Sequence, residues 1–231
     1  MKKIVVLSGA GVSAESGIST FRDSGGLWEK YDIMEIASFE GWQQNRQLVL
    51  DFYNQRRKQL HEVEPNQAHF LIASLEKEFE IQIVTQNVDD LHERAGSTGI
   101  LHLHGELKKV RSTIDHQLVY TLEGWELKEG DLCEKGSQLR PHIVWFGEEV
   151  PAISEAIPHF TSADICLVIG TSLNVYPAAG LIRYLPKQCK LFLIDPNELP
   201  FVNHPSTVHI REKATTGMQI FIEKIKSPSS F

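Results

Sequence analysis

A glycine-rich segment near the N-terminus, from Gly9 to Arg22, has residue types and spacing that suit phosphate binding. Gly9 and Gly11 lack a Cβ, so the chain can turn sharply there and approach a ligand closely, while N–H groups at the start of a following helix face an anion. The pyrophosphate of a dinucleotide is the natural ligand of such a turn. Because the next glycine is Gly17, the spacing departs from G-x-G-x-x-G, and a turn that only joins a strand to a helix is the alternative.

A second polar segment, Thr85 to His92, follows a β-branched run. It contains Gln86, Asn87 and Asp89, and neighbouring amide and carboxylate groups at a strand end are costly unless they bind something. Helix capping is the alternative. It explains the carboxylate more readily than it explains Gln86 together with Asn87.

Two histidines, His102 and His104, stand at the end of another β-branched run, and Gly105 follows them. In an extended strand the two side chains share one face. A histidine suits general-base chemistry because its ordinary pKa lies near neutral pH, although a single histidine at a strand end is more often structural.

The elements that must position these residues alternate along the chain. Five short β-branched runs predict buried strands at 4–7, 81–85, 100–103, 165–169 and 191–194, and helical spacing predicts helices at 67–79, 178–185 and 218–225. Such alternation indicates an α/β fold, a Rossmann-like doubly wound parallel sheet covered by helices. The polar segments after the strands should then meet at the carboxyl edge of the sheet, where open α/β sheets bind ligands.

Two stretches interrupt the alternation and predict a smaller inserted subdomain. The stretch from Ser24 to Glu64 is rich in aromatic and charged residues and includes a predicted helix from about Trp42 to Leu60. The stretch from Glu106 to Leu139 is polar. We therefore expect one domain over 1–231, with a large part formed by about 1–23, 65–105 and 146–231 and a small subdomain formed by about 24–64 and 106–145.

The bulk composition is that of an ordinary globular protein, with 42% hydrophobic and 23% charged residues in a chain of 231. The net charge of −7 argues against sequence-independent nucleic-acid binding but leaves a basic protein segment possible as a partner. The apolar run after Lys3 is too short for a signal peptide, and no run of about eighteen apolar residues predicts a membrane span. We expect a cytoplasmic, monomeric protein.

Three further segments complete a pattern: Leu139 to Glu148, which reads LRPHIVWFGE, Gly170 to Asn174, and Lys213 with Ala214. Together with the segments above, in this order, they resemble the sirtuin family of NAD-dependent protein lysine deacylases. The resemblance extends from about Ile4 to Ile225, almost the whole chain.

The resemblance implies a set of NAD-binding positions. Those on the first loop, near the diphosphate, are Gly9, Ala10, Gly11 and Ser13; those around the nicotinamide and its ribose are Phe21, Arg22, Gln86, Asn87 and Asp89. A second nucleotide loop comprises Gly170, Thr171, Ser172 and Asn174, and the adenosine side has Asp195 and Ala214. Trp28, Val88 and Asn197 complete the implied contacts.

The resemblance also implies a mechanism in which NAD is a consumed co-substrate. The acyl-lysine carbonyl oxygen attacks the ribose carbon that bears nicotinamide, and His104 then acts as general base toward a ribose hydroxyl. The products are free lysine, nicotinamide and an O-acyl-ADP-ribose. The segment containing Val144, Phe146, Gly147 and Glu148 is expected to pair with the backbone of an acylated peptide or protein as an added strand.

The acyl group is indicated by Tyr53 and Arg56, which are three residues apart and share one face of the predicted helix. A phenol hydroxyl and a guanidinium suit a carboxylate, whereas a packed tyrosine with a solvated arginine is the alternative. The pattern resembles the sirtuins that remove succinyl and malonyl groups, with Ala37 at a position that widens the acyl pocket. A mainly deacetylating enzyme, a non-catalytic regulator that binds NAD or ADP-ribose, and a hydride-transferring Rossmann dehydrogenase are the rival functions.

The chain departs from the family where most members hold zinc on two cysteine pairs. Between Lys108 and Leu139 it has a single cysteine, Cys133, which is too few for a thiolate zinc site. The other two cysteines, Cys166 and Cys189, lie further along the chain in apolar runs and are most simply core residues. We expect a zinc-free small domain, with mixed ligation by Cys133, His116 and Asp115 left open. The predicted replacement is an apolar cluster of Val110, Ile114, Leu118, Val119, Tyr120, Leu122, Trp125 and Leu127.

Overall fold

A six-stranded, all-parallel sheet forms the larger part of the protein, for which a computed structural model describes residues 1–18, 31–199 and 204–227. Across the sheet the strands follow the order β3-β2-β1-β7-β8-β9. They are β1 (Lys3–Ser8), β2 (Glu80–Thr85), β3 (Ile100–His102), β7 (Ile165–Ile169), β8 (Lys190–Ile194) and β9 (Thr207–Ile210). The α/β, doubly wound prediction is confirmed. Because β1 pairs with β2 on one side and β7 on the other, the strand order reverses at β1.

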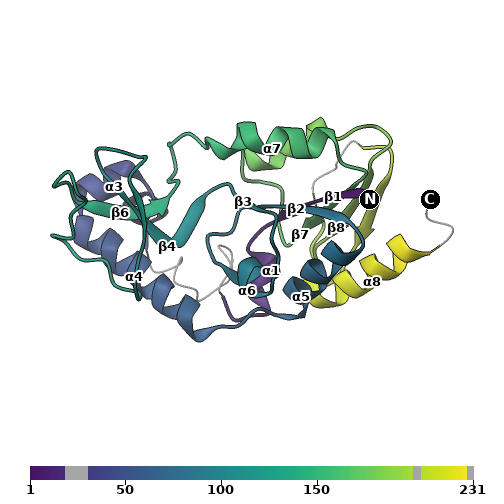
Figure 1. Ribbon diagram of the computed structural model, residues 1–231, viewed down its shortest axis with the longest axis horizontal. Helices are drawn as coiled ribbons and strands as arrows, with labels where there is room; N and C mark the ends of the chain where they lie inside the picture. Colours follow the sequence, from purple (N-terminus) through teal and green to yellow (C-terminus); the bar gives the residue numbers. More distant parts are fainter. Residues whose placement is uncertain (19–30, 200–203, 228–231) are drawn as a thin grey trace.

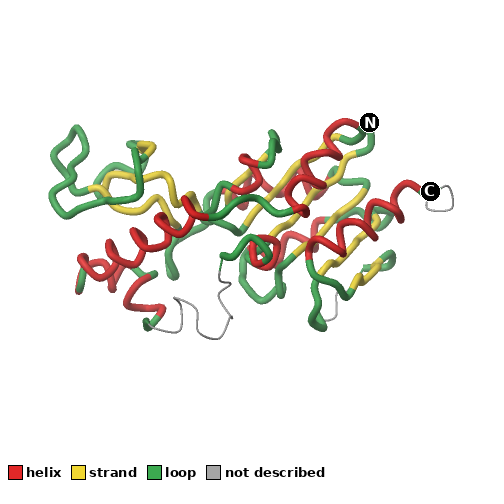
Figure 2. The backbone as a smooth tube through the Cα atoms, turned by 90° about the horizontal axis from the view of Figure 1, so that it is seen from below, coloured by secondary structure: helices red, strands yellow, loops and turns green. Residues whose placement is uncertain are grey.

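Helices cover both faces of this sheet (Figures 1 and 2). Ile4 and Val6 of β1 belong to the core shared with α5 (Gln67–Ser74) and α8 (Ala214–Lys226). Val5 and Leu7 belong to the opposite core, shared with α7 (Ala152–Thr161) and the 3₁₀ helix η3 (Ala178–Tyr184). Successive residues of a strand face opposite sides, so a strand covered on both faces reads as a continuous apolar run.

A second, antiparallel sheet has the order β5-β4-β6. It comprises β4 (Gly105–Ser112), β5 (Val119–Thr121) and β6 (Leu139–Ile143), and it packs with α2 (Ile33–Ile36), α3 (Phe39–Gln44) and α4 (Arg46–Glu62). Figure 1 shows this group beyond the β3 edge of the large sheet. The remaining short elements are α1 (Gly11–Ala14), α6 (Leu91–Arg94) and the 3₁₀ turn η2 (Leu75–Lys77).

Several helix predictions were wrong in their bounds. The single helix expected from Trp42 to Leu60 is two helices, because Asn45 leaves helical geometry and its side chain accepts a hydrogen bond from Leu48 N at the start of α4. The helix expected at 67–79 ends at Ser74 and continues only as η2, and the one expected at 178–185 is 3₁₀. Neither α7 nor β9 was predicted.

The apolar cluster expected to replace a zinc site forms only in part. Val110 and Leu127 are buried, but Ile114 and Trp125 are 67% and 39% exposed. Polar groups of α4 make the additional connection. Arg57, which is buried, donates to the carbonyl oxygens of Trp125 at 2.8 Å and Leu107 at 3.4 Å.

Asn54 extends this connection by binding both main-chain groups of Leu127. Its Oδ1 accepts from Leu127 N at 2.9 Å, and its Nδ2 donates to Leu127 O at 3.0 Å. Side chains of α4 therefore fix the loop that follows β5.

No helix in the described part of the chain has the length and apolar character needed to span a bilayer.

Candidate active site

Loops from several strands of the large sheet meet at its carboxyl edge, next to the point where the strand order reverses. The loop after β2 is joined to the loop after β7 by a hydrogen bond of 3.0 Å from Gln86 Nε2 to Thr171 Oγ1. Gln86 N also donates to Ser8 O at the end of β1. The structure thus brings together three of the polar segments that the sequence indicated, those that follow β1, β2 and β7.

The glycines of the first loop serve the packing of two loops. Gly9 N donates to Ile169 O at 3.0 Å and Gly11 N to Gly170 O at 2.8 Å, so both N–H groups are used within the protein. A Cβ on Gly11 would lie 2.7 Å from Gly170 Cα, and Gly170 itself has a φ of +64°. These two glycines permit close contact between the two loop backbones, and their own N–H groups are bonded within the protein.

Ser13 joins two buried side chains of the second loop. Asn87 Nδ2 donates to Ser13 Oγ at 3.1 Å, and Ser13 Oγ donates to Asp89 Oδ2 at 3.0 Å. Asp89 Oδ1 also accepts from Leu91 N. Burial raises the pKa of the Asp89 carboxyl, and the hydrogen bonds from Leu91 N and Ser13 oppose that rise. The result is a fixed hydroxyl, amide and carboxylate at the switch point of the sheet.

His104 follows β3, and the hydrogen bond of its ring fixes the tautomer. His104 Nδ1 lies 3.1 Å from the carbonyl oxygen of Gln86. A carbonyl oxygen can only accept, so Nδ1 carries the proton and Nε2 keeps its lone pair. Burial lowers the pKa of His104, which favours this neutral form at neutral pH.

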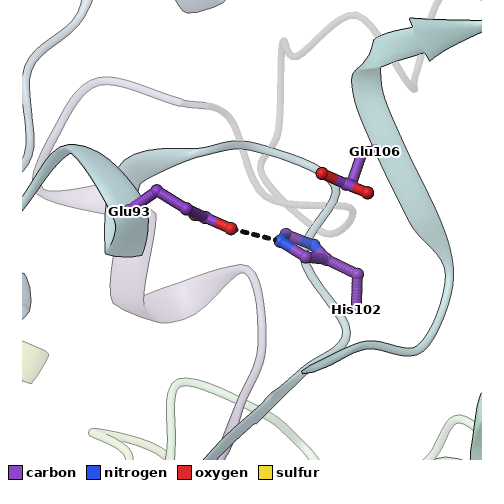
Figure 3. Close-up of side chains that lie close together, drawn as sticks. All are labelled: Glu93, His102 and Glu106. Atoms are coloured by element: carbon purple, nitrogen blue, oxygen red, sulfur yellow. Dashed lines mark hydrogen bonds and ion pairs between the residues drawn. The ribbon is translucent and has the colours of Figure 1, made fainter. Parts of the chain in front are cut away.

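His102 is held in the opposite charge state. Its Nε2 lies 2.7 Å from Glu93 Oε1 (Figure 3). Its Nδ1 lies 3.0 Å from Asn87 O, so both ring nitrogens face acceptors and both carry protons. Burial alone would lower the pKa of His102, but the hydrogen bond and charge of Glu93 outweigh it and raise the pKa. The His102 imidazolium therefore donates a hydrogen bond to the main-chain carbonyl of Asn87 and fixes that loop.

Glu106 completes this group, which is the one set of three side chains among the described residues whose ligand atoms lie close enough together to hold a metal ion. Glu106 pairs with Lys109 Nζ at 2.6 Å. Because both nitrogens of His102 are already engaged, the group acts as an ion-pair network.

Tyr53 and Arg56 lie on α4 as the sequence predicted. Tyr53 is 1% exposed, and its hydroxyl accepts a hydrogen bond of 3.0 Å from Trp145 Nε1. Burial lowers the pKa of Arg56, whereas the neighbouring Tyr53 and Asp89 raise it. The negative charge of the buried Asp89 thus stabilises the positive charge of Arg56. Ala37 is buried in the same apolar cluster as Tyr53.

The segment expected to pair with substrate is partly paired already. Val144 N donates to His104 O at 3.0 Å, and Phe146 N donates to Ala37 O at 2.9 Å. The N–H groups of Val144 and Phe146 are therefore bonded within the protein, and substrate pairing by this segment stays a prediction. The side chain of Phe146 is 47% exposed, and Gly147 has a φ of +87°.

Glu148 was expected at this edge, but its carboxylate is engaged within the protein. It pairs with Arg140 through two hydrogen bonds of 2.6 and 3.0 Å, with Arg111 at 3.2 Å, and with Trp145 N at 2.8 Å. Sequence reasoning assigned no individual role to Arg140 or to Trp145, which lies within the segment expected to pair with substrate. The LRPHIVWFGE segment contained both, yet spacing alone does not reveal that a carboxylate folds back onto an arginine.

The other expected nucleotide contacts follow β2, β7 and β8 or begin α8. Thr171 and Asp195 are buried, Ser172 is half-buried and Asn174 is exposed. Asp195 Oδ1 accepts from both N and Nδ2 of Asn197. Val88 is half-buried beside the small-sheet core, and Ala214 is the buried first residue of α8.

Leu173, between Ser172 and Asn174, has a φ of +56°, a conformation that leucine rarely adopts. Ala10 N-caps α1. Phe21, Arg22 and Trp28 lie outside the described residues.

The residues of the small sheet do not fit the tetrahedral cysteine zinc site that was considered from the sequence. Cys133 Sγ donates to Ser112 Oγ at 3.3 Å, and Asp115 pairs with Lys135 at 2.7 Å. Asp115, His116 and Cys133 do not form a group with clustered ligand atoms among the described residues. A tetrahedral thiolate site needs more sulfur ligands than this sheet offers.

Comparison with known proteins gives a consistent result. The family model described as Sir2 family matches residues 9–177. A protein of Helicobacter pylori (strain J99 / ATCC 700824), named NAD-dependent protein deacylase, is 56% identical over 226 residues, which are 97% of this chain and 96% of that protein. A solved Sir2 homolog–NAD complex has a TM-score of 0.87 at 38% identity, covering 97% of this chain and 90% of the other. A solved Sir2 bound to acetylated peptide has a TM-score of 0.81 at 30% identity, covering 96% and 92%.

Proposed function

The chain belongs to the Sir2 family and, like its relative from Helicobacter pylori, is an NAD-dependent protein deacylase; we propose that it prefers acyl chains that end in a carboxylate, such as succinyl and malonyl, and removes acetyl groups as a second activity. The observation that carries the acyl preference is that Tyr53 and Arg56 lie one turn apart on α4 and influence each other electrostatically. The tyrosine is buried with its hydroxyl held by Trp145, and the arginine is influenced by the Asp89 charge.

The buried polar groups at the switch point fit NAD. In this proposal Asn87 and Asp89 contact the nicotinamide end, Gln86 contacts the adjoining ribose, and Ser13 belongs to the first loop, near the diphosphate. The loop after β7 and the residues Asp195, Asn197 and Ala214 contact the adenosine side. NAD supplies the ribose carbon that the acyl oxygen attacks, with nicotinamide as the leaving group. The fixed network limits how the loops can rearrange, so the polar groups are preorganised for that ligand.

His104 is the proposed general base. Its Nδ1–H is held by Gln86 O, so Nε2 accepts the proton of a ribose hydroxyl. A lowered pKa keeps the imidazole neutral and able to accept at neutral pH.

The proposed substrate is an acylated lysine in a peptide or protein segment. A Sir2 relative has been solved with an acetylated peptide, and in this chain we assign the peptide to the surface at the exposed residues Phe146 and Gly147. Binding to the peptide main chain does not distinguish one acyl group from another, so substrate selection depends on the contacts that the protein makes with the acyl chain. A carboxylate entering near Tyr53 and Arg56 meets one O–H donor and one guanidinium.

A kinetic panel tests the proposal. Acetyl-, succinyl-, malonyl- and longer acyl-lysine versions of one peptide are compared with NAD, and nicotinamide release is followed. We expect kcat/KM for the succinyl and malonyl peptides to exceed that for the acetyl peptide. A higher kcat/KM for the acetyl peptide would make this a deacetylase, and no turnover of any peptide would indicate a regulatory NAD-binding protein.

A further inference from the structure

We propose that Trp145 is a positioning residue for acyl-chain selection, because it holds the Tyr53 hydroxyl in the orientation that donates to an acyl carboxylate. This inference rests on the proposed preference for acidic acyl chains. Trp145 Nε1 lies 3.0 Å from the Tyr53 oxygen. An indole N–H can only donate, so the tyrosine oxygen is the acceptor in this bond.

The direction of that bond determines what Tyr53 offers to a ligand. Since its oxygen accepts from Trp145, the tyrosine's own proton is directed elsewhere. Burial raises the pKa of Tyr53, which keeps the hydroxyl protonated. An ionised carboxylate only accepts hydrogen bonds, and a bond to an ionised acceptor is stronger than a neutral one. An acetyl group has no carboxylate to use this donor.

Trp145 is itself held from three sides. The Arg140 guanidinium stacks over its ring, with Cζ 3.4 Å from the ring centroid, and the ring of Trp42 lies 5.8 Å away. Its main-chain N–H donates to Glu148, the carboxylate that also binds Arg140. A cation over the face of an indole draws on its π-electrons, so Arg140 both fixes the ring and makes the N–H a better donor.

The same residue belongs to the segment proposed to bind the peptide. Trp145 points into the core, whereas its neighbour Phe146 is 47% exposed. Phe146 N binds Ala37 O, so the segment also contacts the residue expected to widen the acyl pocket. The backbone-binding segment and the acyl-reading tyrosine are therefore connected by one side chain.

The experiment combines a double-mutant cycle with NMR of the indole N–H groups. The full-length wild type, Trp145→Phe, Tyr53→Phe and the double variant are each assayed with succinyl- and acetyl-lysine forms of one peptide. We expect Trp145→Phe to lower the ratio of succinyl to acetyl kcat/KM about fivefold, mainly through KM of the succinyl peptide. In the Tyr53→Phe background the same substitution should leave the ratio unchanged.

Trp42→Phe is the matched control, because it removes an indole from the same aromatic cluster and leaves the bond to Tyr53 in place. It should not change the ratio. Independently of turnover, the Trp145 indole N–H signal should shift upfield and exchange faster in Tyr53→Phe, because that variant removes the acceptor.

The outcomes separate the two proposals. A wild-type ratio below one overturns the acyl preference and the inference that rests on it. If the wild-type ratio is above one, the acyl preference stands, and three results would overturn only the inference about Trp145. These are an equal loss of both activities in Trp145→Phe, an effect of Trp145→Phe on the ratio that persists in the Tyr53→Phe background, and a Trp145 indole N–H signal that does not move in Tyr53→Phe.

Discussion

Arg57 donates a hydrogen bond of 2.6 Å to the side chain of Asn54, one turn earlier on α4. Asn54 and Arg57 each follow Tyr53 and Arg56 by one residue, so the two pairs lie on neighbouring faces of α4 and make different contacts. Asn54 and Arg57 bind main-chain groups of the small sheet and the loop after β5, while Tyr53 faces Trp145. The helix that would read the acyl chain is thus fixed to the small sheet by polar contacts.

Removing Arg57 should destabilise the protein. Arg57→Met leaves the carbonyl oxygens of Trp125 and Leu107 and the Asn54 oxygen without this donor, which should lower the free energy of unfolding by about 3 kcal/mol. Urea denaturation measures it. Gln55→Met, an exposed position on the same helix, is the control and should change stability by less than about 0.5 kcal/mol. Equal effects of the two variants would contradict the role of Arg57.

Chelation of metals should change neither the melting temperature nor the deacylase activity. The small sheet offers one thiol, that of Cys133, and that thiol donates to Ser112. The measurement is a thermal melt and an activity assay before and after treatment with a zinc chelator, alongside metal analysis of the purified protein. Near-stoichiometric zinc that survives mild chelation would refute the zinc-free interpretation.

Tyr53→Phe combined with Arg56→Met should reduce desuccinylation far more than deacetylation. Both substitutions keep the bulk of the side chain and remove the groups proposed to bind the carboxylate. Losing a charged contact to a bound carboxylate should cost about 2 to 5 kcal/mol in kcat/KM for the succinyl peptide. Lys58→Met, at an exposed position of the same helix, controls for the loss of one positive charge. A parallel drop in both activities would remove the carboxylate-reading role.

The acid limb of the pH–rate profile should lie below the ordinary histidine value. Burial lowers the pKa of His104, and the base acts only when neutral. As pH falls, kcat/KM should therefore hold until the pH is below about 6.5 and then decline. The acetyl peptide is the substrate to use, because its acyl group does not titrate. An acid limb centred above about 6.5, or one that persists in residual activity of His104→Ala, would argue against His104 as the base.

Most of the large sheet was predictable because its strands are covered on both faces. Ile165–Ile169 was predicted to the residue, and β1 and β2 within one residue at each end. The helix α7 was missed because proline stands at its N-cap and at Pro158, yet Ala156 and Phe160 are fully buried against the sheet, and that packing outweighs the cost of proline. The strand β9 is a short edge strand in which Thr207 and Val208 are exposed and only Ile210 is buried, so its sequence gives little apolar signal.

The site was predictable where its residues follow strands and not where it depends on distant contacts. The placement of Gln86, Asn87, Asp89 and His104 could be predicted because parallel strands end at one edge, whereas the roles assigned to them came from the family resemblance. The bond between Trp145 and Tyr53 joins residues from different elements, which no local pattern encodes. Arg56 and Arg57 are likewise adjacent in sequence, and only the fold shows that Arg57 is the one bound to the small sheet.

The contact between Gly11 and Gly170 matters for protein engineering. The loop after β1 has no room for a methyl group where it meets the loop after β7, and each supplies a backbone group to the other. A designer who grafts the N-terminal glycine motif alone into another sheet would transfer the loop after β1 without the loop after β7 that it packs against. The transferable module is the pair of loops with the strand neighbours that hold them side by side.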